Sequence, residues 1–223
     1  MVQETESYIM PTSVLDSDHP EVSGFVRRIC RGAADQTDMA QRLFVAVSDD
    51  IAYNPYSPFY KPGHYRASNV LERGQGYCVQ KACLLCAVFR AAGIPSRLGF
   101  ATIRNNAAPR EIVDAMGTDL FVYHGYVEAF VQGRWVKATP AFDKSVCDRF
   151  DIDQLVFDGV ADAVFPGTNR SGSPFVDYVE YYGTWADLPL DELLAKWREV
   201  YGEKRISEWI DAFESGMADG WKP

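Results

Sequence analysis

The chain has 223 residues, 47% of them hydrophobic and 13% aromatic, which is enough for one sizeable domain with a full core. Its formal net charge is −9 and no basic cluster stands out, so the composition argues against binding to nucleic acids or to anionic membranes. The longest apolar stretch, residues 79–92, is too short to span a bilayer and is followed by Gly93.

The first residues of the chain lack the basic start and the apolar segment of a signal peptide, so we expect a cytoplasmic protein. The five cysteines agree with this expectation. Their odd number and irregular spacing argue against the disulfide framework of a secreted domain.

Two helices are predicted in the first 50 residues. Capping residues in the segment 12–18 precede a helix from about Pro20 to Gly32. Residues 35–50 carry apolar side chains at helical spacing, which predicts a second helix. Residues 51–63 contain three prolines and several tyrosines and read as a loop.

Residues 73–100 are the most informative segment. Gly74 and Gly76 end the preceding element, Cys78 follows at the start of an almost wholly apolar helix, and Gly93 stops that helix. The free N–H groups and the positive dipole end of a helix favour thiolate over thiol, so we expect a lowered pKa and a thiolate nucleophile at Cys78. The alternative is a core cysteine, because free cysteine is often buried.

Cys83 and Cys86 form a C-x-x-C pair on the same predicted helix. A redox pair or half of a metal site is one interpretation of this spacing. Two core cysteines one helical turn apart are the favoured interpretation, because the sequence offers no second C-x-x-C and no nearby histidine.

Residues 120–142 predict a β-hairpin, because aromatic and β-branched residues flank a short turn at Gln132-Gly133. If Val131 faces Arg134, then His124 lies opposite Ala141, and Thr139 and Asp143 become its diagonal neighbours on the same face. A cysteine hydrolase needs this combination, since an imidazole exchanges protons with the thiol and a third group orients the imidazole. A satisfied core histidine is the alternative.

After residue 148, glycines and prolines mark a long irregular stretch. A helix is predicted from Leu190 to Tyr201, between Pro189 and Gly202, and a further one over residues 205–215. This C-terminal segment either packs over the site or forms a dimer contact, and the sequence does not decide between these.

The runs GYCVQKACLLCAVFRAAGIPSRLGFA and HGYVEAFVQGRWVKATPAFD resemble the transglutaminase-like superfamily of cysteine enzymes, in particular its short bacterial and archaeal members. The resemblance covers about residues 45–150. It implies an α+β, papain-like (cysteine proteinase) fold in which a buried N-terminal cysteine helix packs on an antiparallel β-sheet. It further implies Cys78 as nucleophile and His124 as general base and acid. It also makes Tyr53, Tyr56 and Tyr60 candidates for substrate contact, although aromatic packing within the loop is the favoured interpretation.

The sequence departs from the family pattern at one place. Family members commonly carry an Asp just before a Pro at the end of the second hairpin strand, whereas this chain has Thr139-Pro140. We therefore predict Asp143 as the third member of the triad, because a carboxylate holds an imidazolium better than a hydroxyl does. Thr139 is the alternative.

These observations predict a single transglutaminase-like domain over residues 1–223, with a core at about 45–150 and an extension at about 151–223. The expected activity is acyl transfer, or hydrolysis of a peptide or amide substrate, through a thioester. The residues imply no cofactor and no metal, and they leave the oligomeric state open. The alternatives are a catalytically impaired binding module and a metal or redox protein that uses Cys83 and Cys86.

Overall fold

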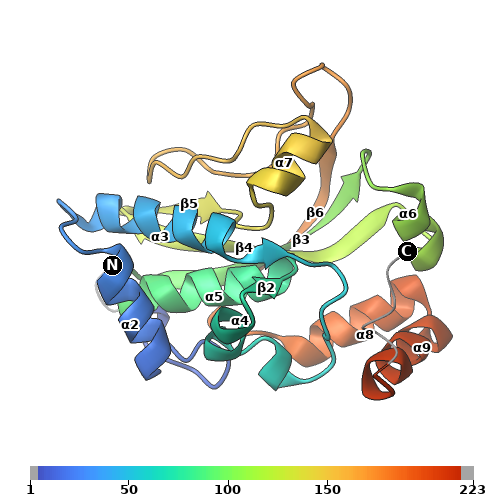
Figure 1. Cartoon of the computed structure of the whole chain (residues 1–223), viewed down its shortest axis with the longest axis horizontal. Coiled ribbons are helices and arrows are strands. Elements are labelled where there is room, and N and C mark those ends of the chain that lie inside the picture. Colours follow the sequence, from blue (N-terminus) through green and yellow to red (C-terminus); the bar gives the residue numbers. More distant parts are fainter. Residues whose placement is uncertain (1–4, 217–223) are drawn as a thin grey trace.

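The computed structural model describes residues 5–216 and contains a four-stranded antiparallel sheet with helices packed against it (Figure 1). The strands are β3 (Ser96–Asn105), β4 (Leu120–Val131), β5 (Arg134–Ala138) and β6 (Val176–Trp185). Their order across the sheet is β5-β4-β3-β6. A short parallel pair of β1 (Ala52–Tyr53) and β2 (Gln75–Gly76) precedes the cysteine helix.

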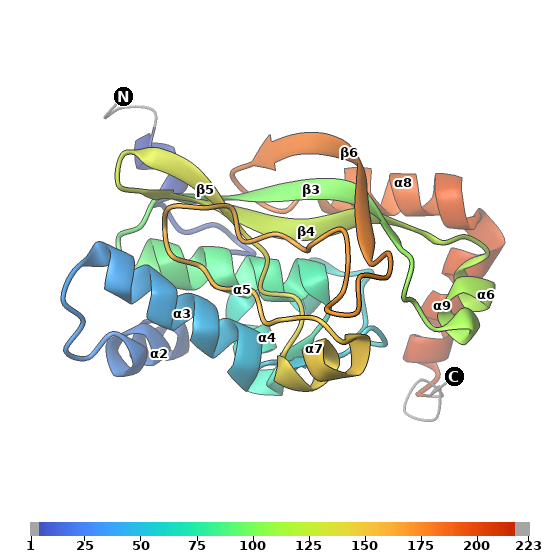
Figure 2. The same ribbon diagram turned by 90° about the horizontal axis from the view of Figure 1, so that it is seen from above.

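The helices fall into two groups. The first group is α2 (Pro20–Ile29), α3 (Gln36–Asp50), α4 (Ala67–Arg73) and α5 (Cys78–Ala91). Later in the chain follow α6 (Arg110–Met116), α7 (Lys144–Phe150), α8 (Leu190–Tyr201) and α9 (Glu203–Glu214), and short 3-10 helices occur at η1 (Glu6–Tyr8) and η2 (Pro62–His64). Both views place α6, α8 and α9 together at one end of the molecule (Figure 2).

Helix α5 is the centre of the core. It packs on β3 and β4, and α2, α3 and α4 surround its other faces. Residues 79–90 are all buried, as a helix that is apolar on every side requires. The long polar side chains within this stretch bond to backbone carbonyls: Lys81 Nζ donates to Ser48 and Ile51 at the end of α3, and Arg90 donates to Ser96. The buried cysteine helix on an antiparallel sheet is therefore confirmed.

Most predicted helices are present with small shifts of their ends. Helix α2 ends three residues before the predicted Gly32, α3 agrees with the prediction for residues 35–50, and α8 has the predicted bounds. Between β3 and β4, residues 105–117 contain the short helix α6. It starts after Pro109 and ends at Gly117, which adopts the left-handed conformation with φ 73°.

The hairpin register is confirmed where the strands pair. Val131 faces Arg134, and the ladder continues to the pair Val127 and Ala138. The extension of this register to His124 and Ala141 was wrong. The Thr139 N–H donates to the carbonyl of Ala163 instead, and Pro140 has no N–H with which to continue the ladder.

Strand β6 was missed within the stretch predicted to be irregular. It pairs with β3 along its length, from Asn105↔Val176 to Leu98↔Trp185. Two register irregularities interrupt this ladder, and β6 exposes several of its side chains, so its sequence shows no clean alternation of buried and exposed positions.

Candidate active site

Cys78 is the first residue of α5, as predicted. Gly74 ends α4 in the left-handed conformation with φ 62°, and the pairing of Tyr53 with Gly76 then directs the chain into the new helix. The Tyr77 N–H donates to the Gln80 side chain at 3.3 Å, and this capping interaction fixes the first turn of α5. The thiol therefore stands at the N-terminal end of a long, buried and well-capped helix.

The electrostatic setting of Cys78 differs from the prediction. Burial raises the pKa of its thiol to about 11, against the lowering effect of the backbone N–H groups of Gly125, Val79 and Cys78 itself. The prediction of a low pKa for Cys78 was wrong, because it considered the helix N-terminus but not the apolar surroundings of the sulfur. At neutral pH the side chain is a thiol.

His124 projects from β4 at a β-bulge. The register between β3 and β4 shifts between Ala101 and Ile103, and Tyr123, the residue before the histidine, has φ 57°. Positive φ is costly for an aromatic residue, and such strained positions occur preferentially at functional sites. The bulge re-aims the side chain that follows it.

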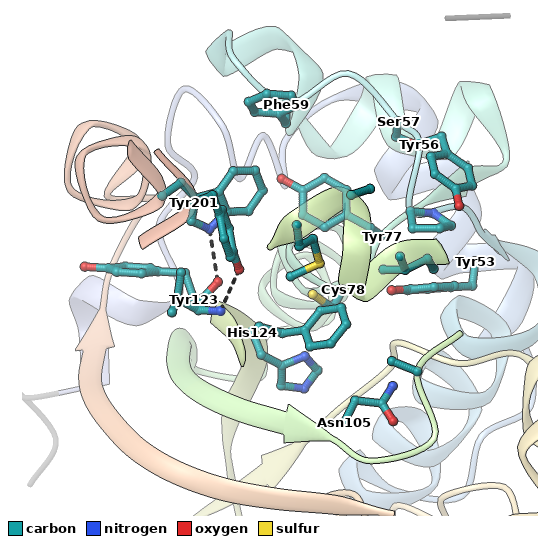
Figure 3. A pocket seen from close by; sticks show the side chains of 18 of the residues that line it. Tyr53, Tyr56, Ser57, Phe59, Tyr77, Cys78, Asn105, Tyr123, His124 and Tyr201 are labelled. Atoms are coloured by element: carbon teal, nitrogen blue, oxygen red, sulfur yellow. Dashed lines mark hydrogen bonds between the residues drawn. The ribbon is translucent and has the colours of Figure 1, made fainter. Parts of the chain in front are cut away.

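Two aromatic residues of α8 hold this bulge in place. The Val122 N–H donates to the Tyr201 hydroxyl at 2.9 Å, and Trp197 Nε1 donates to the Val122 carbonyl at 3.0 Å (Figure 3). Both backbone polar groups of Val122 are thus bonded to side chains of α8. The predicted C-terminal segment therefore packs against the site.

The His124 ring lies in an apolar environment with 4% of the residue exposed. It contacts the rings of Phe165 and Tyr178, and its Nε2 has no hydrogen-bond partner among residues 5–216. Burial lowers the pKa of His124 to about 4. The imidazole is therefore neutral at pH 7 and is able to accept a proton.

Cys78 and His124 line one pocket of about 180 Å³ (Figure 3). Within the part of the chain that the structure describes, no hydrogen bond joins the two side chains. The arrangement is a neutral thiol and a neutral imidazole that share a cavity, rather than a preformed ion pair.

Asp143 and Thr139, the two candidates for the third member of the triad, lie close to the site. Oδ1 of Asp143 accepts hydrogen bonds from the N–H groups of Ser145 and Val146 and so caps α7, while Oδ2 accepts one from the Tyr53 N–H at 2.8 Å. Although burial alone would raise it, a hydrogen bond from the Ser145 hydroxyl to Oδ1 and the N–H groups of Tyr53 and Val146 lower the pKa of Asp143. Neither oxygen bonds to His124 in this structure.

Thr139 is fully buried, and its hydroxyl makes no hydrogen bond of standard geometry with any described residue. Burial raises the pKa of Tyr178, and the nearby Thr139 hydroxyl is one of the groups that oppose this rise. Thr139 and His124 are therefore both neighbours of Tyr178.

The remaining sequence candidates are placed as follows. Tyr53 and Tyr56 line the pocket, whereas Tyr60 does not and packs against Phe59. Cys83 and Cys86 are fully buried in α5, where burial raises the pKa of both thiols. Among the described residues, no group of three or more His, Cys, Asp and Glu side chains is arranged to hold a metal ion.

Sequence reasoning missed one wall of the pocket. Helix α6 contributes Ile112 and Met116, and the helices α8 and α9 contribute further aromatic side chains. These aromatic residues are Trp197, Tyr201, Trp209 and Phe213. A signal was present, because each helix carries its two aromatics at i and i+4, on one face.

The chain matches one family of known proteins. A family model described as the transglutaminase-like superfamily matches residues 23–140. A search among curated proteins finds no match. No helix in residues 5–216 is both long and apolar enough to cross a bilayer.

Solved structures give three similar chains. A candidate cysteine protease from Cytophaga hutchinsonii matches 61% of this chain at 17% identity with a TM-score of 0.48. A candidate protease from Parabacteroides distasonis matches 57% at 16% identity with a TM-score of 0.41. The periplasmic domain of TgpA from Pseudomonas aeruginosa, bound to ethylmercury, matches 60% at 19% identity with a TM-score of 0.38. The matches extend over 42%, 24% and 50% of those chains.

Proposed function

Because this chain belongs to the transglutaminase-like superfamily and has its papain-like α+β fold, we propose that it is a cysteine-dependent enzyme that cleaves or transfers an amide through a thioester. In this proposal Cys78 is the nucleophile and His124 is the general base and acid. One observation carries the proposal: the thiol at the first residue of α5 and the imidazole at the β4 bulge open onto the same pocket.

The proposed reaction has two halves. His124 takes the proton from the Cys78 thiol as the sulfur forms a bond with the substrate carbonyl carbon, and the Cys78 N–H receives the developing oxyanion. The C–N bond then breaks as the imidazolium gives its proton to the leaving amine. In the second half, water or an acceptor amine gives a proton to His124 and attacks the thioester, the C–S bond breaks, and the sulfur recovers its proton.

The protonation states of Cys78 and His124 without substrate determine when the proton is transferred in this proposal. The pKa of about 11 at Cys78 and of about 4 at His124 keep the proton on the sulfur. Each unit of difference between the two pKa values adds about 1.4 kcal/mol to the cost of moving the proton from the sulfur to the imidazole. The proposal therefore has His124 remove the proton during attack, once the bound substrate has changed the surroundings of both groups, rather than before it.

For the third position, Asp143 stays the proposed residue and Thr139 the alternative. The Tyr53 N–H donates to Oδ2 of Asp143 at 2.8 Å. To orient the imidazole, the Asp143 carboxylate therefore has to release this N–H and bond to His124 instead. The cytoplasmic location and the division into a core and a C-terminal extension also stay proposals, which cell fractionation and limited proteolysis would test.

A binding module without activity is the second candidate function. It is favoured by one observation: within residues 5–216 the buried Nε2 of His124 has no hydrogen-bond partner, and the chain has Thr139 where the resemblance to the family implies an aspartate. The rate of Cys78 alkylation as a function of pH distinguishes an activated thiol from an inert one.

The proposed function is tested by incubation with peptide amides, with and without an added primary amine, followed by mass spectrometry of the intact protein and of the products. We expect a thioester adduct on Cys78, an acid product with water, and a new amide with the amine. Cys83→Ala is the matched control, because Cys83 lies on the same helix and does not line the pocket. Equal turnover by the wild type and Cys78→Ala would contradict the proposal.

A further inference from the structure

The pocket beside Cys78 has an uncharged, aromatic lining. None of its described lining side chains belongs to Asp, Glu, Lys or Arg. Because an unpaired charge is costly to bury in such a cavity, charged groups are disfavoured as ligands. We infer that the proposed enzyme acts on substrates that carry a bulky apolar group, aromatic or branched aliphatic, on the acyl side of the scissile amide. This inference rests on the proposed function and names its substrate class.

The size of the cavity agrees with one such group. Its volume is about 180 Å³, and an apolar cavity of about 150 Å³ in another protein is sufficient to hold benzene. A phenyl or isobutyl side chain therefore fits. A glutamine side chain fits by size, but its amide would lose its hydrogen bonds to water, and the lining offers few polar atoms to replace them.

Much of the apolar wall comes from helices other than α5, which carries Cys78. Trp197 on α8 and Trp209 and Phe213 on α9 lie beyond residues 23–140, the part that matches the family model. Ile112 and Met116 come from the short helix α6. These residues face the same cavity as Cys78, so the C-terminal helices supply the selectivity while α5 and β4 supply the chemistry.

Polar groups suited to the substrate backbone lie on the same walls. Ser57 and Asn105 line the pocket together with several tyrosines. A few polar groups in an apolar pocket fix the orientation of a ligand without favouring a charged side chain. The lining therefore matches an uncharged peptide or acyl amide with one large apolar group.

The experiment uses a series of fluorogenic peptides, acetyl-Ala-Ala-X-aminomethylcoumarin, in which X is Phe, Leu, Gln, Glu or Lys. We expect kcat/KM for Phe and Leu to exceed that for Gln by about 10-fold and that for Glu or Lys by about 100-fold. Ile112→Glu introduces a charge into the pocket lining and should remove the preference for Phe. Val113→Glu is the matched control, because the neighbouring residue on α6 is half-buried and does not line the pocket.

A binding measurement separates this inference from the proposed function. The peptides acetyl-Ala-Ala-X-amide are titrated into Cys78→Ala while tryptophan fluorescence is followed, because Trp197 and Trp209 line the cavity. Tighter binding of the Phe peptide than of the Glu peptide, by about 10-fold or more, supports the inference even where no peptide is cleaved. Cleavage of the Glu or Lys peptide as fast as the Phe peptide, or equal binding of all five, would overturn it.

Discussion

The cysteine side and the histidine side of the site are built in different ways. On the cysteine side, three backbone N–H groups surround the sulfur, two from the first turn of α5 and one from Gly125 on β4. On the histidine side, the surroundings are side chains: two aromatic rings contact His124, and its Nε2 has no partner among the described residues.

The surroundings of Cys78 are therefore fixed by the backbone, whereas the orientation of His124 depends on side chains that one substitution can remove. Backbone donors persist whatever side chains the chain carries, so the setting of Cys78 follows from the fold itself. The orientation of an imidazole depends on one acceptor, and Thr139 stands where the family commonly has an aspartate. The following predictions test this contrast, beginning with the largest expected effect.

Cys78→Ala should abolish turnover, with a loss of more than about 1,000-fold, because no other group can form the thioester. Cys83→Ala and Cys86→Ala should retain turnover and lose about 1 kcal/mol of unfolding free energy, since each removes a buried thiol from the core. Steady-state kinetics and urea unfolding measure both effects. Loss of turnover in Cys83→Ala at full stability would contradict the assignment.

Gly125→Ala should destabilise the protein by about 3 kcal/mol, because helix and strand approach too closely for a side chain. An added Cβ would lie 2.9 Å from the Val79 Cα, which is backbone and cannot turn away. Urea unfolding measures the loss. Gly167→Ala is the control, because its added Cβ would meet nothing within 4 Å and its unfolding free energy should change little. Similar values for both variants would refute the close approach.

His124 should make the protein less stable in acid. Its pKa is about 4 in the folded chain and near 6.5 when unfolded, so between these values only the unfolded chain binds the proton. The free energy of unfolding should therefore fall by about 3 kcal/mol as the pH drops from 6.5 to 4. His124→Gln should remove this component. His64→Gln should remove a further part of the acid sensitivity, because burial also lowers the pKa of His64.

Thr139→Asp should raise the pKa of His124 by about 1 to 3 units, because a neighbouring carboxylate favours the imidazolium. Turnover should rise as well, since the ring gains an orienting partner. NMR titration of the three histidines measures the pKa directly. Thr139→Asn, which matches the size without the charge, should change the pKa less. An unchanged His124 pKa in Thr139→Asp would show that position 139 does not face the ring.

Asp143→Asn should have the smallest effect on stability, a loss of about 1 kcal/mol, because the amide keeps an oxygen for the α7 cap and loses an acceptor for the Tyr53 N–H. Asp143→Ala should lose more, since it removes both. Turnover decides the catalytic role: a drop of orders of magnitude in Asp143→Asn would support Asp143 as the orienting residue, and unchanged turnover would favour Thr139.

The features that could be predicted from sequence are local. The start of α5 at Cys78 follows from glycines and apolar spacing, and the Val131–Arg134 register follows from a two-residue turn. The raised pKa of Cys78 could not be predicted this way, because it depends on how other segments pack around the sulfur. The same holds for the place of β6 in the sheet. The aromatic faces of α8 and α9 are visible in the sequence, but their position at the pocket depends on contacts distant in sequence.

The anchoring of the β4 bulge by α8 also sets an order of events during synthesis. A ribosome delivers the chain from its N-terminus, so Cys78 and His124 emerge well before Trp197 and Tyr201 exist. Until then, the N–H and C=O of Val122 lack the two side chains that hold them beside the strained Tyr123. The nascent chain thus carries Cys78 and His124 before the two side chains that hold the β4 bulge have been synthesised.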